Sequence, residues 1–197
     1  IATDASGNTH YTTAIVTIVD TTAPVVTTQN ITVALNSRGQ ASITAAQINN
    51  GSTDNTEIAS MSVSPSTFTC SNLGTNTVTL TVTDIYGNIG TSTATVTVID
   101  TTLPTIVAPA AIATTTNAGC TRTGLALGTP VTTDNCTVAS VTNNAPVAFP
   151  LGSTTVTWTV VDGSGNTATA TQVVTVTDIT ASLRLKKKLK LVQTLNF

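Results

Sequence analysis

The sequence predicts an all-β protein made of a β-sandwich domain that is repeated in tandem. Its eight aspartates recur in sets whose members lie 80 or 78 residues apart: Asp4, Asp20, Asp54, Asp84, Asp100, Asp134, Asp162 and Asp178. Three of them open D-x-x-G-N turns, three close the apolar strand that follows such a turn, and two lie in T-D-N turns. Self-similarity at a fixed period indicates a repeat architecture.

Composition supports β structure and an extracellular setting. Threonine is the most abundant residue and aromatic residues make up 3%. The many β-branched side chains favour pleated, half-buried strands over helix. Residues 1–180 carry nine acidic residues against Arg38 and Arg122, a net charge of −7, which disfavours nucleic acid as a partner. The sequence has no run of 18 apolar residues, so no transmembrane segment is expected in it.

One full period, beginning near Pro24, is expected to contain at least five strands. We place them at 25–33, 41–48, 58–63, 78–82 and 92–99. The strands at 78–82 and 92–99 alternate apolar residues with threonine, which is typical of strands with one buried face. The D-x-x-G-N sequence between them predicts a tight hairpin.

Five to seven short strands in about 80 residues are typical of an immunoglobulin-like β-sandwich. The boundaries are expected at the D-T-T-x-P segments, because proline stiffens a linker and cannot donate to a β-ladder. The predicted organisation is the end of a first repeat at 1–22, complete repeats at 23–102 and 103–180, and a basic non-repeat tail at 181–197. Since the sequence opens inside a strand-and-turn unit, we expect it to be a piece of a longer protein.

The repeated motif resembles a known family. The pattern G-[ST]-x-x-V-T-x-T-V-x-D-x-x-G-N, followed by T-A-T-x-x-V-T-V-x-D and T-x-P, is similar to the hyalin repeat, an immunoglobulin-like module of extracellular proteins. It spans 152–166 in the last copy and 74–88 in the middle copy, and 1–20 matches only the end of a copy.

The resemblance implies a structural or adhesive stalk, since hyalin repeats occur in bacterial surface adhesins and animal matrix proteins. It implies an extracellular or cell-surface location, other copies of the repeat as partners, an unknown surface or matrix ligand, and no catalysis. Two alternatives stay open. One is a self-assembling filament subunit that exchanges strands between chains, and the other is a spacer module of a larger secreted enzyme.

The resemblance also bears on the three cysteines. Cys120 and Cys136 stand where many hyalin-like repeats carry a pair, which implies a disulfide between them; a bond closing such a loop contributes on the order of 3 kcal/mol. Family members with a cysteine at the position of Cys70 have a partner in the returning strand, where this sequence has Ser92. Cys70 is therefore expected to be free and buried, or available to another chain.

Catalytic motifs are not found in the sequence. His10 is the only histidine and falls in a predicted strand, and Glu57 is the only glutamate and has no counterpart in the other copy. The G-x-S-x-G, H-E-x-x-H and phosphate-loop motifs are absent from the sequence. The sequence therefore predicts a protein that is not an enzyme.

The aspartates suggest calcium. In an immunoglobulin-like sandwich, the linker before the first strand, the loop after the second and the last hairpin turn share one end of the domain. This predicts two triads, Asp20 with Asp54 and Asp84, and the 80-residue equivalents Asp100, Asp134 and Asp162. Converging carboxylates can hold Ca²⁺. The alternative is that each aspartate accepts backbone N–H bonds within its own turn.

Two further features concern the surface and the ends. The D-T-T segments resemble the signal for bacterial O-glycosylation, which would place glycans on Thr21 and Thr101. The tail contributes five of the seven basic residues and could contact an acidic surface, or it could be a non-native end. The incomplete first copy leaves apolar residues such as Ile15, Val16 and Ile18 without a full sandwich, so the missing strands must come from N-terminal sequence outside this chain or from a neighbour. On the polymer hypothesis we expect 1–20 to pair with strands of another chain.

Overall fold

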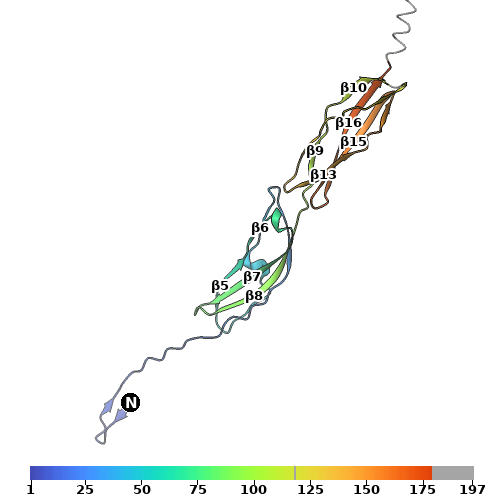
Figure 1. Cartoon of the computed structure of the whole chain (residues 1–197). Coiled ribbons are helices and arrows are strands. Elements are labelled where there is room, and N and C mark those ends of the chain that lie inside the picture. The colour runs from blue at the N-terminus through green and yellow to red at the C-terminus, as the bar shows by residue number, and fades with distance from the viewer. Residues whose placement is uncertain (118, 179–197) are drawn as a thin grey trace, which may run out of the picture. The chain divides into compact units, whose positions relative to one another are not determined.

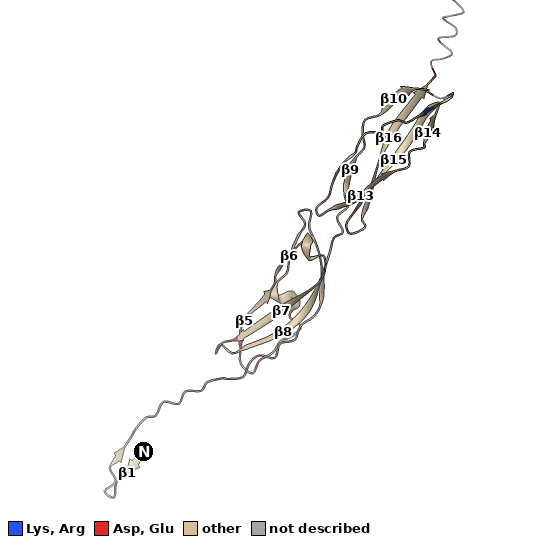
Figure 2. Cartoon of the chain, viewed as in Figure 1, with Lys and Arg blue, Asp and Glu red and all other residues tan. Residues whose placement is uncertain are grey.

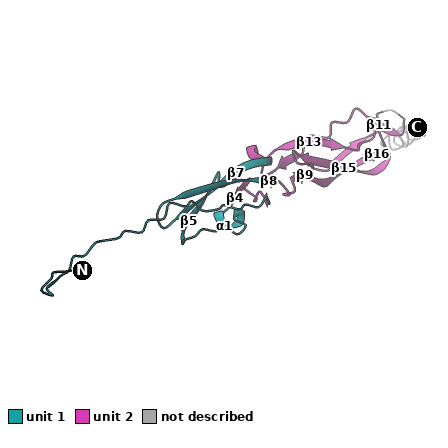
Figure 3. Cartoon of the chain, turned by 90° about the horizontal axis from the view of Figure 1, so that it is seen from below, with its two compact units in different colours: residues 1–31, 42–66, 75–97 teal, residues 32–41, 67–74, 98–197 magenta. Residues whose placement is uncertain are grey.

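A computed structural model describes residues 1–117 and 119–178 of the chain (Figure 1). The packing of the backbone divides it into two compact units (Figure 3). The first consists of Ile1–Ile31, Ser42–Ser66 and Thr75–Thr97, and the second of Thr32–Ala41, Thr67–Gly74 and the chain from Val98 onward. The second unit thus contains one end of the middle repeat together with the last repeat. The predicted tail at 181–197 lies outside the described residues.

The N-terminal segment forms a short antiparallel hairpin of β1 (Ala2–Thr3) and β2 (Thr9–His10). The remainder, up to the linker at Asp20, has no regular structure, and Ile15 is 96% exposed. Within this chain β1 pairs with β2, and the expected pairing of 1–20 with strands of another chain stays a prediction.

Besides two isolated bridges, the middle repeat contains eight elements. In chain order they are β3 (Ile31–Ala34), β4 (Gln40–Ser42), α1 (Ala45–Ile48), β5 (Ile58–Ser64), β6 (Thr67–Thr69) with the 3₁₀ turn η1 (Cys70–Asn72), β7 (Gly74–Asp84) and β8 (Ile89–Ile99). One sheet has the order β3-β8-β7-β5, and β4 and β6 form a second, two-stranded sheet.

The last repeat has the same plan. Its elements are β9 (Thr105–Val107), β10 (Ile112–Thr115), β11 (Thr121–Thr123), β12 (Val131–Thr133), β13 (Val138–Asn143), β14 (Ala148–Pro150), β15 (Gly152–Asp162) and β16 (Thr167–Thr177). The main sheet has the order β10-β16-β15-β13, with β10 parallel to β16 and the other pairs antiparallel. Two-stranded sheets pair β9 with β12 and β11 with β14.

The central hairpins confirm the tandem all-β prediction. Strands β7 and β15 are both eleven residues long and have the same sequence of buried and exposed positions. Valine and leucine point inward in β7, valine and Trp158 point inward in β15, and threonine points outward in both, so the core lies between the sheets. The structure is therefore a tandem of immunoglobulin-like β-sandwich repeats, as the sequence predicts.

The predicted strand at 41–48 is wrong over its second half. Only Gln40–Ser42 is extended, and Ala45–Ile48 forms the helical turn α1. The backbone N–H of Thr44 donates to Gln47 Oε1 at 2.8 Å, a contact typical of a helix N-terminus. Two alanines follow Thr44, and Ile48 is fully buried at the end of the turn. Local capping therefore outweighs strand propensity here.

The core of the last repeat contains one buried polar pair. Trp158 Nε1 donates to Gln172 Oε1 at 3.1 Å, and Gln172 Nε2 donates to the carbonyl oxygens of Ala110 at 2.8 Å and Leu127 at 2.9 Å. Gln172 is 2% exposed, so each of these bonds replaces water that cannot reach the site. In the middle repeat, Leu80 and Ala94 occupy the equivalent positions 78 residues earlier. The polar side chain of Gln172 is thus present in the repeat that has the indole of Trp158 and absent from the repeat that has leucine instead.

None of the helices in the described part of the chain has both the length and the apolar character needed to cross a membrane.

Replacing Gln172 by alanine is expected to lower the free energy of unfolding by about 2–5 kcal/mol, because the indole N–H and two carbonyl groups would lose their partner inside the core. Denaturant titration of the full chain measures this. The matched control is Gln29→Ala, which removes an exposed amide that donates to Gln47 O at 3.0 Å; its effect should stay below about 1 kcal/mol. Equal effects at the two sites would contradict the assigned role.

Candidate functional site

In the two complete repeats, the D-x-x-G-N hairpin turn is built around a buried carboxylate. Asp84 Oδ1 accepts the N–H groups of Tyr86 and Asn88, both at 2.8 Å, and its Oδ2 accepts Asn88 Nδ2 at 2.7 Å. Gly87 has a φ of 88°, a conformation that favours glycine. Asp162 makes the equivalent bonds with Ser164 and Asn166. The turn sequence is therefore explained by local hydrogen bonding.

The asparagine of each turn also fixes the linker that enters the same repeat. Asn88 Nδ2 donates to the backbone oxygen of Asp20 at 3.1 Å, and Asn166 Nδ2 donates to that of Asp100 at 3.2 Å. This contact brings the linker aspartate beside the turn aspartate. The third member of each triad comes from the T-D-N turn.

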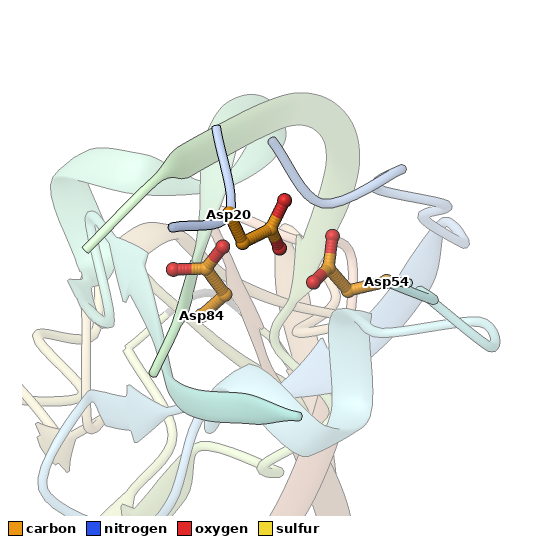
Figure 4. A group of neighbouring side chains, drawn as sticks. All are labelled: Asp20, Asp54 and Asp84. Atoms are coloured by element: carbon orange, nitrogen blue, oxygen red, sulfur yellow. The ribbon is translucent and has the colours of Figure 1, made fainter. Parts of the chain in front are cut away.

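The first triad converges as expected from the topology (Figure 4). Asp20, Asp54 and Asp84 each offer a carboxylate oxygen, and these oxygens lie within 4.8 Å of one another. Asn55 Nδ2 donates to Asp20 Oδ1 at 3.1 Å. The Thr56 hydroxyl lies 2.9 Å from Asp20 Oδ2 and 2.6 Å from Asp54 Oδ2. Because a hydroxyl has one proton, it donates a hydrogen bond to only one of these two oxygens at a time.

The second triad, Asp100, Asp134 and Asp162, is packed equally closely, within 4.8 Å. Thr102 N–H and Asn135 Nδ2 donate to Asp100 Oδ1 at 3.0 and 3.1 Å, and Cys136 N–H donates to Asp134 Oδ2 at 2.9 Å. Asp100 Oδ2 and Asp134 Oδ1 are buried and have no hydrogen-bond partner in the described structure. The residue equivalent to Thr56 is Cys136, which offers no hydroxyl.

Hydrogen bonding stabilises the charged form of three of these carboxylates. The Thr22 backbone N–H, the Asn55 amide and the Thr56 hydroxyl lower the pKa of Asp20 from 3.8 to about 2. Burial by itself raises the pKa of Asp84 and of Asp162. The bonds from Asn88 or Asn166 and from the turn N–H groups outweigh burial, so both pKa values are lowered.

The disulfide prediction is wrong. The bond joins Cys70 to Cys136, with a Cα–Cα distance of 5.5 Å and 66 residues of sequence separation, and Cys120 is free and exposed. It therefore links the middle repeat to the last, and both cysteines belong to the second compact unit.

Strand topology explains why Cys120 cannot reach Cys136. Cys120 precedes β11, which pairs with β14 just before β15 begins. Cys136 lies beside the turn at the other end of β15, where Gly163 N–H donates to Thr137 O at 2.9 Å. Eleven residues of extended strand span about 35 Å, whereas bonded cysteines have Cα atoms within about 7 Å.

Loops of the middle repeat lie directly against the T-D-N turn that holds Cys136. Asn135 Nδ2 donates to Asn36 O at 3.1 Å. A Cβ atom on Gly39, whose φ is 70°, would lie 2.6 Å from Cys70 Sγ and 2.7 Å from Asn135 O. Only a residue without a side chain fits there. We define this contact of the loops at 36–39 and 70–72 with the turn at 134–136 as the clamp.

The remaining candidate residues are not brought together. Thr21 and Thr101 are exposed, and their glycosylation stays a prediction. His10 is exposed in β2. Figure 2 shows that charged residues are sparse along the described chain. Sequence reasoning missed the clamp, although one signal was present: Thr56 and Cys136 are the residues that differ between two otherwise matching aspartate-asparagine turns.

Comparison with known families and structures confirms the predicted relationship. The HYR domain model matches residues 99–176, which include most of the last repeat. Solved structures with a similar chain course include protocadherin gamma B7 domains 1–4 (12% identity, TM-score 0.37, 79% of this chain and 51% of that one). Another is Drosophila N-cadherin EC1–4, with 11% identity, a TM-score of 0.39, and coverage of 79% of this chain and 50% of that one. A third is human protocadherin-24 EC1–2, with 13% identity, a TM-score of 0.38, and coverage of 75% of this chain and 94% of that one.

This chain spans about half the length of the first and second of these structures. No conclusion on function follows from likenesses this distant. Comparison with curated proteins found no match.

Thiol mapping should distinguish the two disulfide assignments. Iodoacetamide added to the unreduced, denatured chain is expected to label Cys120 alone, because only its thiol is free. After reduction, all three cysteines should be labelled, which peptide mass spectrometry can follow. Labelling of Cys70 alone before reduction would restore the bond between Cys120 and Cys136.

Acid should destabilise the fold through the aspartate turns. A carboxyl whose pKa is lower in the folded state contributes stability above its unfolded pKa and loses it as pH falls through the folded pKa. For Asp20 this window runs from 3.8 down to about 2. Denaturation midpoints in chelator should be level above pH 4 and decrease toward pH 2, with a shallower decrease in Asp20→Asn. An identical decrease in that variant would contradict the assignment.

Proposed function

We propose that this chain is a segment of a tension-resisting, non-catalytic stalk of an extracellular, adhesion-type repeat protein. The observation that carries the proposal is the Cys70–Cys136 bond, which joins successive repeats covalently. A module that only displayed a binding surface would have no need of such a bond between copies.

The position of the bond suits a chain under tension. When the two ends are pulled, the load passes from Cys70 through the sulfur atoms to Cys136 and bypasses the residues between them. The bypassed stretch includes β7 and β8 of the middle repeat and β9 and β12 of the last. These strands cannot be drawn out while the bond lasts.

Three further observations support the setting and the absence of catalysis. The disulfide is of the kind that persists in oxidising, extracellular compartments. Residues 99–176 match the HYR domain, a module whose relatives are adhesive rather than catalytic. The turn hydrogen bonds of Asp84 and Asp162 lower the pKa of both carboxyl groups, which disfavours either group as a proton donor near neutral pH. Neighbouring copies of the repeat are the partners that this proposal requires.

Extension of the full chain between two handles tests the proposal. The bond should hide about 230 Å of contour length, because 66 residues at roughly 3.5 Å each remain outside the stretched path. Reductant added under constant load should release this length as a step. The Cys70→Ser/Cys136→Ser variant should be long from the start, and the control Cys120→Ser should behave as the wild type.

Equal lengths for the wild type and the double variant, or no step on reduction, would contradict the proposal. Complete extension of the oxidised chain at loads that barely straighten an unfolded polymer would instead favour a passive spacer. A filament subunit would be indicated if the chain elongated into polymers at micromolar concentration.

A further inference from the structure

The second aspartate triad contains buried carboxylate oxygens that the fold does not satisfy. Asp100 is 7% exposed, and its Oδ2 atom has no hydrogen-bond partner within the described residues. The same holds for the buried Oδ1 atoms of Asp134 and Asn135. Buried polar atoms are almost always paired, so three unpaired oxygens on residues of one cluster point to a missing partner.

The chemistry of these atoms favours a cation as that partner. Each of the three atoms is an acceptor, and two of them belong to carboxylates packed within 4.8 Å of a third, Asp162. The chain before residue 179 has Arg38 and Arg122 as its only Lys and Arg residues, so positive side chains are scarce. The donors that do reach the triad are amide N–H groups, which occupy Asp100 Oδ1 and Asp134 Oδ2.

The first triad provides an internal comparison. Its Thr56 hydroxyl lies within hydrogen-bond distance of both Asp20 and Asp54, and only Asp54 Oδ1 is left as a buried unpaired oxygen. In the second triad this hydroxyl is replaced by Cys136, whose sulfur is bonded to Cys70. The substitution that forms the clamp therefore also removes the neutral donor from the carboxylates.

We propose that Asp100, Asp134 and Asp162, with the side-chain oxygen of Asn135, bind one calcium ion beside the clamp. Calcium takes six to eight hard oxygen ligands and tolerates irregular geometry, which suits four protein oxygens completed by water. The first triad binds calcium more weakly, because Thr56 already supplies a proton where the ion would sit. Since Asp134, Asn135 and Cys136 are consecutive, the ion holds the turn that carries the disulfide.

Calorimetric titration of the oxidised full chain with CaCl₂ tests this inference. We expect one site with a dissociation constant on the order of 10⁻⁴ to 10⁻³ M, typical of extracellular modules, and a rise in the melting temperature by mass action. Asp134→Asn should weaken this site at least about tenfold, since it removes one of few charged ligands. MgCl₂, in a parallel titration, should bind more weakly because the site is irregular.

Two variants provide controls within the same chain. Asp4→Asn alters an exposed D-x-x-G-N turn that belongs to neither triad and should leave calcium binding unchanged. Thr56→Val removes the hydroxyl from the first triad and should create a second site of similar affinity. Circular dichroism of each variant without calcium establishes that it is folded.

Three results would overturn the inference. One is the absence of both binding heat and thermal stabilisation in the wild type at 10 mM calcium, a concentration above the expected range. Another is equal affinity in Asp134→Asn and Asp4→Asn. The third is a wild-type site that is lost in Asp54→Asn instead of Asp134→Asn, which would place the ion in the first triad.

Discussion

The hydrogen bond from the turn asparagine to the linker is the interaction on which the aspartate cluster of each repeat depends. Asn166 Nδ2 lies within bonding distance of Asp162 Oδ2, at 2.7 Å, and of the backbone oxygen of Asp100, at 3.2 Å. Asn88 does the same for Asp84 and Asp20. One amide thus ties the last hairpin of a repeat to the linker that enters it. These hydrogen bonds fix the backbone of the linker beside the backbone of the turn. Because the backbones lie close together, the carboxylates of the linker and turn aspartates also lie close together.

One position of the repeat makes the two aspartate triads chemically different. Thr56 gives its triad a hydroxyl donor, whereas Cys136 makes a covalent bond to the preceding repeat. The cysteine joins two repeats covalently but leaves buried carboxylate oxygens without a donor. Covalent linkage and unmet negative charge therefore arise from the same substitution, and the proposed calcium ion would satisfy the charge without disturbing the bond.

The strands and the triads were predictable from the sequence because their causes are local. Alternation of valine with threonine specifies β7 and β15, and the spacing of Asp54 and Asp134 places each in the loop nearest the hairpin turn. The Gln172 and Trp158 pair was missed, although a glutamine at an inward position of an alternating strand is a visible signal.

The pairing of Cys70 with Cys136 could not be predicted in the same way. It depends on a contact between two repeats, and a resemblance within one repeat led to Cys120 instead. The helical turn Ala45–Ile48 was also missed, because four residues are too short for a periodic pattern and the decisive feature is the contact of Thr44 with Gln47.

Amide hydrogen exchange, residue by residue, in the oxidised and reduced chain tests the clamp most directly. The amides of Gly39 and Cys136, inside the clamp, are bonded to Asn36 O and Asp134 Oδ2, and the amide of Leu73, directly after its second loop, is bonded to Cys70 O. If the clamp exists, the three amides are protected together in the oxidised chain and lose protection together on reduction, while the β15–β16 ladder is unaffected. Unchanged protection at these amides after reduction would contradict the account.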